Sequence, residues 1–119
     1  MGKVAMICNG SEEKNIFPAL VLAAAAVAGG DDVIMFFEPE AAPALVRGAL
    51  EALNERAKGW SDLMGLLEGF QVLGGRMLLC ELAFGVKGIK REDLREGVEI
   101  VDAPTFLNEV RDAQLAFSF

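Results

Sequence analysis

The chain has 119 residues, a length typical of one domain, with 11 Lys and Arg against 18 Asp and Glu. The net charge of −7 repels phosphate backbones, so we do not expect nucleic acid as a partner. Histidine is absent, which removes the commonest general base and metal ligand, and we expect no cofactor. The sequence shows neither a signal peptide nor an apolar run of bilayer length, so we expect a cytoplasmic protein without a membrane partner.

Apolar runs and helical patterns alternate along the first part of the chain. Residues 4–8 form an apolar run that ends in the turn sequence of residues 9–11, which predicts a strand. A helix is expected to follow, capped by Ser11 and running to about Ala28. Pro18 lies inside this pattern and is expected to kink the helix or to delay its regular part. Residues 33–37 predict a second strand.

The alternation continues to the end of the chain, where each segment is bounded by glycine, proline or charged residues. The further expected elements are helices over 43–58 and from Ser61 to Gly74, a strand over 76–80, a short helix over 81–86, a helical turn over 91–95, a strand over 98–101, a helix over 104–113 and a strand over 115–119. Alternating strands and helices predict an α/β fold of three layers, with helices on both faces of a mostly parallel, five-stranded sheet. We expect a single domain over residues 1–119.

Ligands of open α/β sheets bind at the carboxyl ends of the strands, and both cysteines of the chain end a predicted strand. Cys80 is the stronger candidate, because the expected helix after it could stabilise its thiolate through N-terminal amides. Glu81 is adjacent and would raise the thiol pKa if its carboxylate pointed the same way. The alternative is that Cys80 is a buried cysteine that packs as a small apolar residue.

The end of the first predicted strand offers a weaker candidate. Cys8 is expected to pack in a central strand, although it is a possible second thiol and a disulfide with Cys80 is conceivable if their strands are neighbours. Asn9, Gly10 and Ser11 could hold an anion through backbone amides at the start of a helix. A helix cap explains the same three residues, and the sequence shows no phosphate-binding glycine motif.

The segment that begins at Cys80 carries the most distinctive pattern of the chain. It combines a cysteine after the third strand, a short helix ending in Gly-Ile, an acidic turn and a Thr-Phe-Leu helix. The residues are Cys80-Glu81, Gly88-Ile89, Glu92-Asp93-Leu94, Gly97-Val98-Glu99 and Thr105-Phe106-Leu107. This pattern resembles the C-terminal half of the DsrE/DsrF-like family, and residues 33–37 resemble its second strand.

The resemblance implies an α/β/α domain that assembles into small homo- or hetero-oligomers. It also implies, from the sulfur-relay members of the family, that Cys80 takes up sulfane sulfur as a persulfide and passes it to a partner protein. Such transfer needs an accessible thiolate and neither a metal nor a histidine. The leading hypothesis is therefore a sulfur carrier or sulfurtransferase, with sulfur-donor and sulfur-acceptor proteins as partners. The alternative is a non-catalytic, homo-oligomeric interaction module in which Cys80 is structural.

Overall fold

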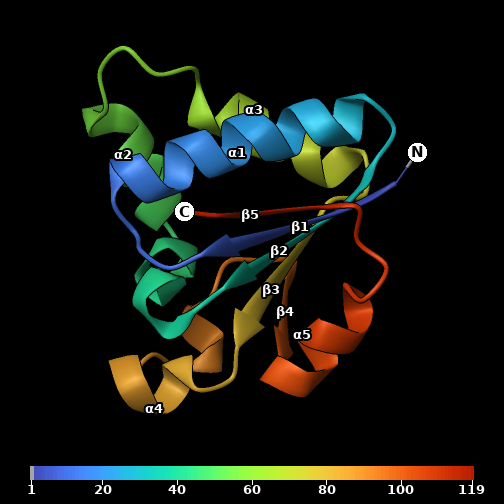
Figure 1. Ribbon diagram of the computed structural model, residues 1–119. Helices are drawn as coiled ribbons and strands as arrows, with labels where there is room; N and C mark the ends of the chain where they lie inside the picture. Colours follow the sequence, from blue (N-terminus) through green and yellow to red (C-terminus); the bar gives the residue numbers. More distant parts are fainter. Residues whose placement is uncertain (1) are drawn as a thin grey trace.

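The computed structural model describes residues 2–119, and a five-stranded sheet runs through the middle of this part of the chain (Figure 1). The strands are β1 (Lys3–Cys8), β2 (Asp32–Phe37), β3 (Arg76–Cys80), β4 (Val98–Val101) and β5 (Leu115–Ser118). They are ordered β4-β3-β2-β1-β5, and every neighbouring pair is parallel. The carboxyl ends of all five strands therefore lie at one edge of the sheet.

Helices cover both faces of this sheet. They are α1 (Glu13–Ala28), η1 (Pro39–Leu45), α2 (Ala49–Arg56), α3 (Leu63–Val72), α4 (Ala83–Lys87), η2 (Arg91–Asp93) and α5 (Ala103–Glu109), η marking 3-10 helices. In Figure 1, α1 and α3 lie on one side of the sheet and α5 lies on the other. The expected three-layer α/β/α fold is confirmed, with a sheet that is entirely parallel rather than mostly parallel.

The register of the strands assigns their side chains to two faces, because neighbours in a parallel sheet point the same way and residues along a strand alternate. The first face packs against α1, α2 and α3 to form the large core. The second face carries a smaller cluster of buried side chains. Its members are Ile34, Phe36, Leu78, Cys80 and, from α5, Phe106.

The helices expected over 43–58 and 104–113 differ from the structure in their extent. The helix expected over 43–58 is divided into η1 and α2, because Pro43 lies inside η1 and Gly48 adopts a positive φ of 89° before α2 begins. The helix expected over 104–113 ends at Glu109, after which the chain turns back to the sheet. The N–H of Gln114 donates to the carbonyl of Lys3 (2.9 Å), and this contact leads the chain into β5.

Helix α1 begins one residue later than expected and is not interrupted. Its N-cap is Glu12, not Ser11, and Asn15 completes a capping box by accepting from the N–H of Glu12 (3.2 Å). Pro18 lies inside the helix, which continues to Ala28. No helix of residues 2–119 has both the length and the apolar character that crossing a membrane requires.

Candidate functional site

Cys80 is the last residue of β3 and lies at the carboxyl edge of the sheet. Its neighbour in β4 is Val101, whose carbonyl accepts a hydrogen bond from the N–H of Glu81 (2.9 Å). The register aligns Cys80 with the smaller face of the sheet, where it belongs to the cluster that α5 covers. Only 3% of Cys80 is exposed. The expected position of this thiol is therefore confirmed, and it is buried.

Phe106 joins α5 to this face of the sheet. Its ring stacks on that of Phe36, with centroids 4.2 Å apart and planes 9° from parallel. The helix that carries it begins at Asp102, whose carboxylate accepts from the N–H of Thr105 (2.8 Å). Hydrogen bonds from the side chain and from the backbone N–H of Thr105 lower the pKa of Asp102. Because β4 ends at Val101, the cap turns the chain over the smaller face directly after the strand next to Cys80.

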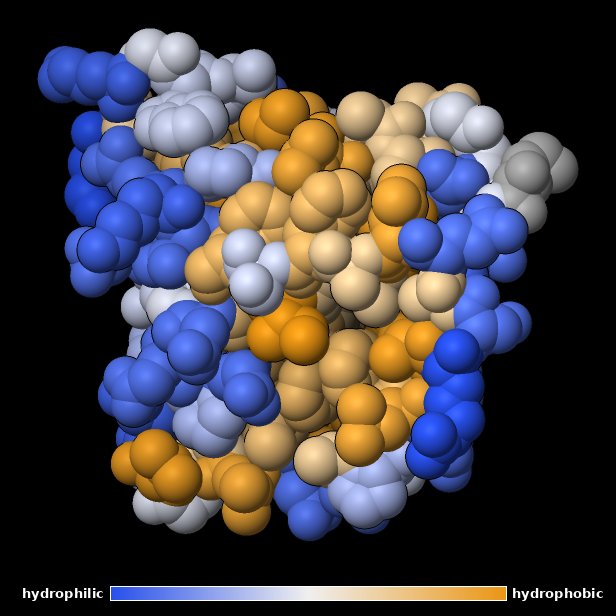
Figure 2. Space-filling model, viewed as in Figure 1, coloured by the Kyte–Doolittle hydropathy of each residue, from blue (hydrophilic) through white to orange (hydrophobic). Residues whose placement is uncertain are grey.

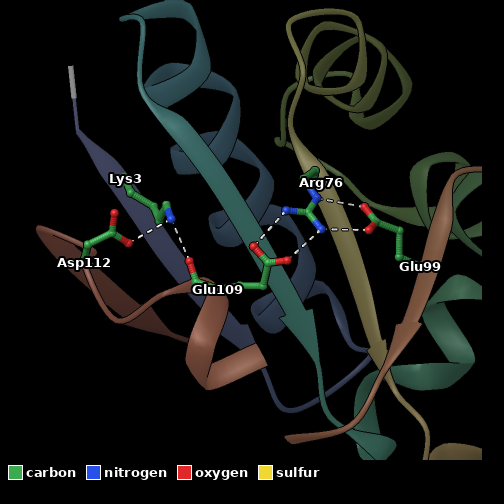
Figure 3. A network of polar contacts seen from close by, with 5 residues as sticks. All are labelled: Lys3, Arg76, Glu99, Glu109 and Asp112. Carbon is green, nitrogen blue, oxygen red and sulfur yellow. Dashed lines mark hydrogen bonds and ion pairs between the residues drawn. The ribbon is translucent and has the colours of Figure 1, made fainter. Parts of the chain in front are cut away.

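Ionic contacts hold the other end of α5 (Figure 3). The guanidinium of Arg76, at the start of β3, binds Glu99 through two hydrogen bonds of 2.8 and 2.9 Å and contacts the carboxylate of Glu109 at 3.3 Å. Lys3 donates to the carbonyl of Glu109 (2.7 Å) and to the carboxylate of Asp112 (2.8 Å). The hydrogen bonds from Arg76 lower the pKa of Glu99, and those to Glu99 and Glu109 raise the pKa of Arg76.

Helix α4 does not supply the thiolate stabilisation that the sequence suggested. It begins at Ala83, with Leu82 as its N-cap, so two residues separate Cys80 from the helix. Ala83 is buried in the large core, on the opposite side of the sheet from the cluster that holds Cys80. The first turn of α4 therefore packs away from the thiol. Glu81 is exposed to solvent.

Cys8 occupies the equivalent place at the end of β1 but faces the large core. It is fully buried, and desolvation raises the pKa of its thiol to about 12. Strand β2 lies between β1 and β3, and the two cysteines belong to clusters on opposite faces. The sulfur atoms cannot be bridged without moving a strand, so the conceivable disulfide between Cys8 and Cys80 is not part of this structure.

The turn after β1 makes hydrogen-bonding and packing contacts within the protein. The N–H of Asn9 donates to the carbonyl of Phe119 (2.8 Å), and Gly10 packs against the side chain of Asn15. Ser11 lines an open hollow of about 420 Å³ together with two acidic residues, two basic residues and a leucine. These residues are Glu12, Glu13, Lys14, Arg56 and Leu53. The two carboxylates oppose an anion there, and the helix-cap interpretation of Ser11 is wrong, because the N-cap of α1 is Glu12.

Metal-ligating side chains do not converge on a common point within residues 2–119. The residues around Cys80 that the sequence analysis did not single out are those that hold α5, namely Phe36, Arg76 and Glu109. One signal was present, since Arg76, Leu78 and Cys80 alternate along β3 and therefore share a face. The pairing of Arg76 with Glu109 depends on tertiary structure and had no signal in the sequence.

The comparisons with known proteins agree with this architecture. Residues 42–117 match the DsrE/DsrF/DrsH-like family. The crystal structure of the ychN protein from E. coli is similar over 100% of both chains, with a TM-score of 0.79 and 23% sequence identity. MTH1491 from Methanobacterium thermoautotrophicum, a protein of unknown function, is similar over 98% of this chain and 97% of its own, with a TM-score of 0.72 and 15% identity. No curated protein gives a significant match to the sequence.

Proposed function

Because the chain belongs to the DsrE/DsrF/DrsH-like family, we propose that it is a cytoplasmic sulfur carrier that holds sulfane sulfur as a persulfide on Cys80. The observation that supports this proposal is the place of Cys80 at the carboxyl end of β3, the edge where α/β sheets hold their ligands. A sulfur-donor protein and a sulfur-acceptor protein are the partners that such a carrier requires.

The proposed transfer is an exchange between sulfur atoms. The Cys80 thiolate attacks the terminal sulfur of a donor persulfide, a new S–S bond forms on Cys80, and the donor leaves as a thiolate. In the second step an acceptor thiolate attacks the terminal sulfur on Cys80, whose S–S bond breaks to return the Cys80 thiolate. Each step breaks one S–S bond and forms another, so the transfer involves no net oxidation and uses no further reactant.

The burial of Cys80 suits the storage of a reactive persulfide and sets a condition on its loading. While this cover is closed, the apolar side chains beside Cys80 keep water and thiols away from a persulfide. Donor and acceptor can reach the sulfur only after part of this cover moves. The proposal therefore requires loading through an open form of the protein.

Uptake of sulfur from inorganic polysulfide, followed by the mass of the intact protein, tests this proposal. The expected product is one added sulfur atom per chain, located on Cys80 by peptide analysis. Cys80→Ala should remove the adduct, whereas the matched variant Cys8→Ala should keep it, since Cys8 is sealed in the large core. An adduct of equal yield on Cys80→Ala would defeat the proposal.

A second candidate function, a homo-oligomeric interaction module with a structural Cys80, is favoured by the free edge of β5. Phe119 uses its N–H and carbonyl to bond Ile7 and Asn9 of the neighbouring chain segment (both 2.8 Å). By strand alternation, Ala116 and Ser118 present their main-chain groups to the outer edge. The sequence of β5 has neither the charge nor the proline that protects exposed edges.

Apolar side chains surround this edge. Leu22 of α1 and Leu115 and Phe117 of β5 are each between 38% and 54% exposed and line a hollow of about 260 Å³. Figure 2 shows an apolar surface that extends over the part of this face where α1 and β5 lie. A second copy, related by a two-fold axis, could pair β5 with β5 and bury the same side chains from both subunits.

The mass of the assembly in solution, measured by sedimentation, tests this second candidate. The expected species is a dimer or a multiple of it, and Leu115→Lys should dissociate it. Val72→Lys is the matched control, because Val72 is an exposed apolar residue (75%) at the end of α3. A monomeric wild-type protein would contradict the module, and so would a Leu115→Lys variant that assembles normally.

A further inference from the structure

The cover over Cys80 comes from two sources, the neighbouring strands and α5. Strands β2 and β4 flank β3; Val101 of β4 aligns with Cys80, and Phe36 of β2 aligns with Leu78, the next residue of β3 on this face. The outer side of the cluster is closed by Phe106. Among residues 2–119, α5 is the helix that contributes a buried side chain to this cluster.

Helix α5 is held to the sheet by little apolar surface. It has seven residues, of which Phe106 is the one buried member, while five others are exposed. The exposed residues are Ala103, Pro104, Thr105, Leu107 and Asn108. Segments with few buried contacts and exposed backbone hydrogen bonds open locally at a small fraction of the free energy of global unfolding. By this criterion α5 is able to open locally while the sheet stays folded.

Val110, the C-cap of α5, is partly buried against the cluster, and the other attachments of α5 are partly exposed ionic contacts. The side chains of Arg76 and Glu109 are each 37% exposed, and Asp112, which pairs with Lys3, is 75% exposed. Ion pairs of this kind contribute little to stability and weaken as salt is added. These contacts position the end of α5 but add little to the free energy that its opening requires.

We propose that α5 is a lid that opens to expose Cys80, with Phe106 as its plug and the contacts from Arg76 and Lys3 as its latch. The cap at Asp102 and the turn after Glu109 are the two ends about which it moves. In the closed form Phe106 stacks on Phe36 and the thiol is sealed, and in the open form the smaller face of the sheet is accessible. The use of this movement for loading rests on the proposed function, whereas the movement itself does not.

The rate at which iodoacetamide alkylates Cys80 in the native protein tests the lid. All measurements use a Cys8→Ala background, so that Cys80 is the one thiol that iodoacetamide can modify. Weakening the latch with Glu109→Gln should raise the rate about two- to fivefold, and added salt should do the same to the parent protein. Phe106→Ala should raise it by about tenfold or more. The matched control is Glu51→Gln, which weakens the ion pair of Glu51 with Arg95 (3.2 Å), away from the cluster.

Two results on the protein without added sulfur would overturn the lid. One is an alkylation rate in Glu109→Gln that equals the rate in Glu51→Gln. The other is exposure of Cys80 only by global unfolding, seen as α5 amides that exchange hydrogen no faster than those of β2 and β3. Faster alkylation without sulfur uptake from polysulfide would retain the lid and remove the carrier. Sulfur uptake that Glu109→Gln and Phe106→Ala leave unchanged would retain the carrier and remove the lid.

Discussion

Cys8 and Cys80 end two strands at the same edge of the sheet, yet their side chains lie on opposite faces. The register aligns Cys8 with Phe37 and Cys80 with Val101, and the two thiols fall into separate buried clusters. The large core seals Cys8 beneath α1, whereas one short helix covers the face of Cys80. This difference in cover, rather than position along a strand, distinguishes a structural thiol from a candidate reactive one.

The first prediction concerns the selectivity of the two thiols. In the native protein at neutral pH, iodoacetamide should modify Cys80 and leave Cys8 untouched, because Cys8 is fully buried and its pKa is raised to about 12. Both should react after denaturation. Peptide mass analysis measures each site. Modification of Cys8 at the same rate as Cys80, or an intramolecular disulfide in protein of native circular dichroism, would contradict the structure.

The second prediction follows from the pKa of Cys8. A thiol whose pKa is raised on folding stabilises the native state fully below its unfolded value of 9.0, and this contribution is lost as pH rises toward about 12. The free energy of unfolding should therefore fall above pH 9, by up to about 1.4 kcal/mol for each pH unit. Urea denaturation across this range measures it. Cys8→Ala should show a shallower alkaline slope, and an identical slope would contradict the assignment.

Acid should also lower the free energy of unfolding, in this case through Glu99. The hydrogen bonds from Arg76 lower the pKa of this carboxyl below its ordinary value of 4.5. Its contribution to stability is present above that value and is lost as pH falls through the lowered pKa. Because the pair is partly exposed, we expect an effect of about 1 kcal/mol or less. Glu99→Gln should flatten the acid limb of the stability curve, and an unchanged limb would show that this pair contributes nothing.

Two glycines near the end of α3 should respond in opposite ways to alanine. A Cβ at Gly75 would collide with the ring of Phe70, which is fully buried, so Gly75→Ala should destabilise the protein by about 1–3 kcal/mol. A Cβ at Gly69 meets open space inside the helix, and Gly69→Ala should stabilise it by up to about 1 kcal/mol. Urea midpoints compare the pair, and equal shifts would contradict the packing of Phe70.

The sequence was sufficient for the architecture because local signals and burial agree along the chain. The third and fourth strands have the predicted bounds, Arg76–Cys80 and Val98–Val101, and each follows a glycine that ends the preceding segment. The predictions failed where particular hydrogen bonds, local or from distant residues, decide an end. Ser11 is not the cap of α1 because Asn15 pairs with Glu12, and the helix after Val101 is shortened where Lys3 draws the chain back to the sheet.

The candidate site was predictable in position and not in surroundings. Cys80 could be placed at the carboxyl edge because the end of its strand was evident from the apolar run. It shares its buried cluster with Phe106, which is 26 residues later (106 − 80), and no periodicity relates the two. The opposite facing of Cys8 and Cys80 likewise required the strand order. Tertiary arrangement, rather than local pattern, decides whether a cysteine at a strand end is accessible.

A complete cycle of loading and discharge on the Cys8→Ala protein is the most direct test of Cys80 as a sulfur carrier. The folded protein is loaded with polysulfide, separated from the excess, and mixed with a small thiol as acceptor, while intact mass is followed over time. We expect each chain to gain one sulfur atom and then to return it to the acceptor, recovering its original mass with its fold intact. A folded protein that gains no sulfur, or that gains it and never releases it, would contradict the account.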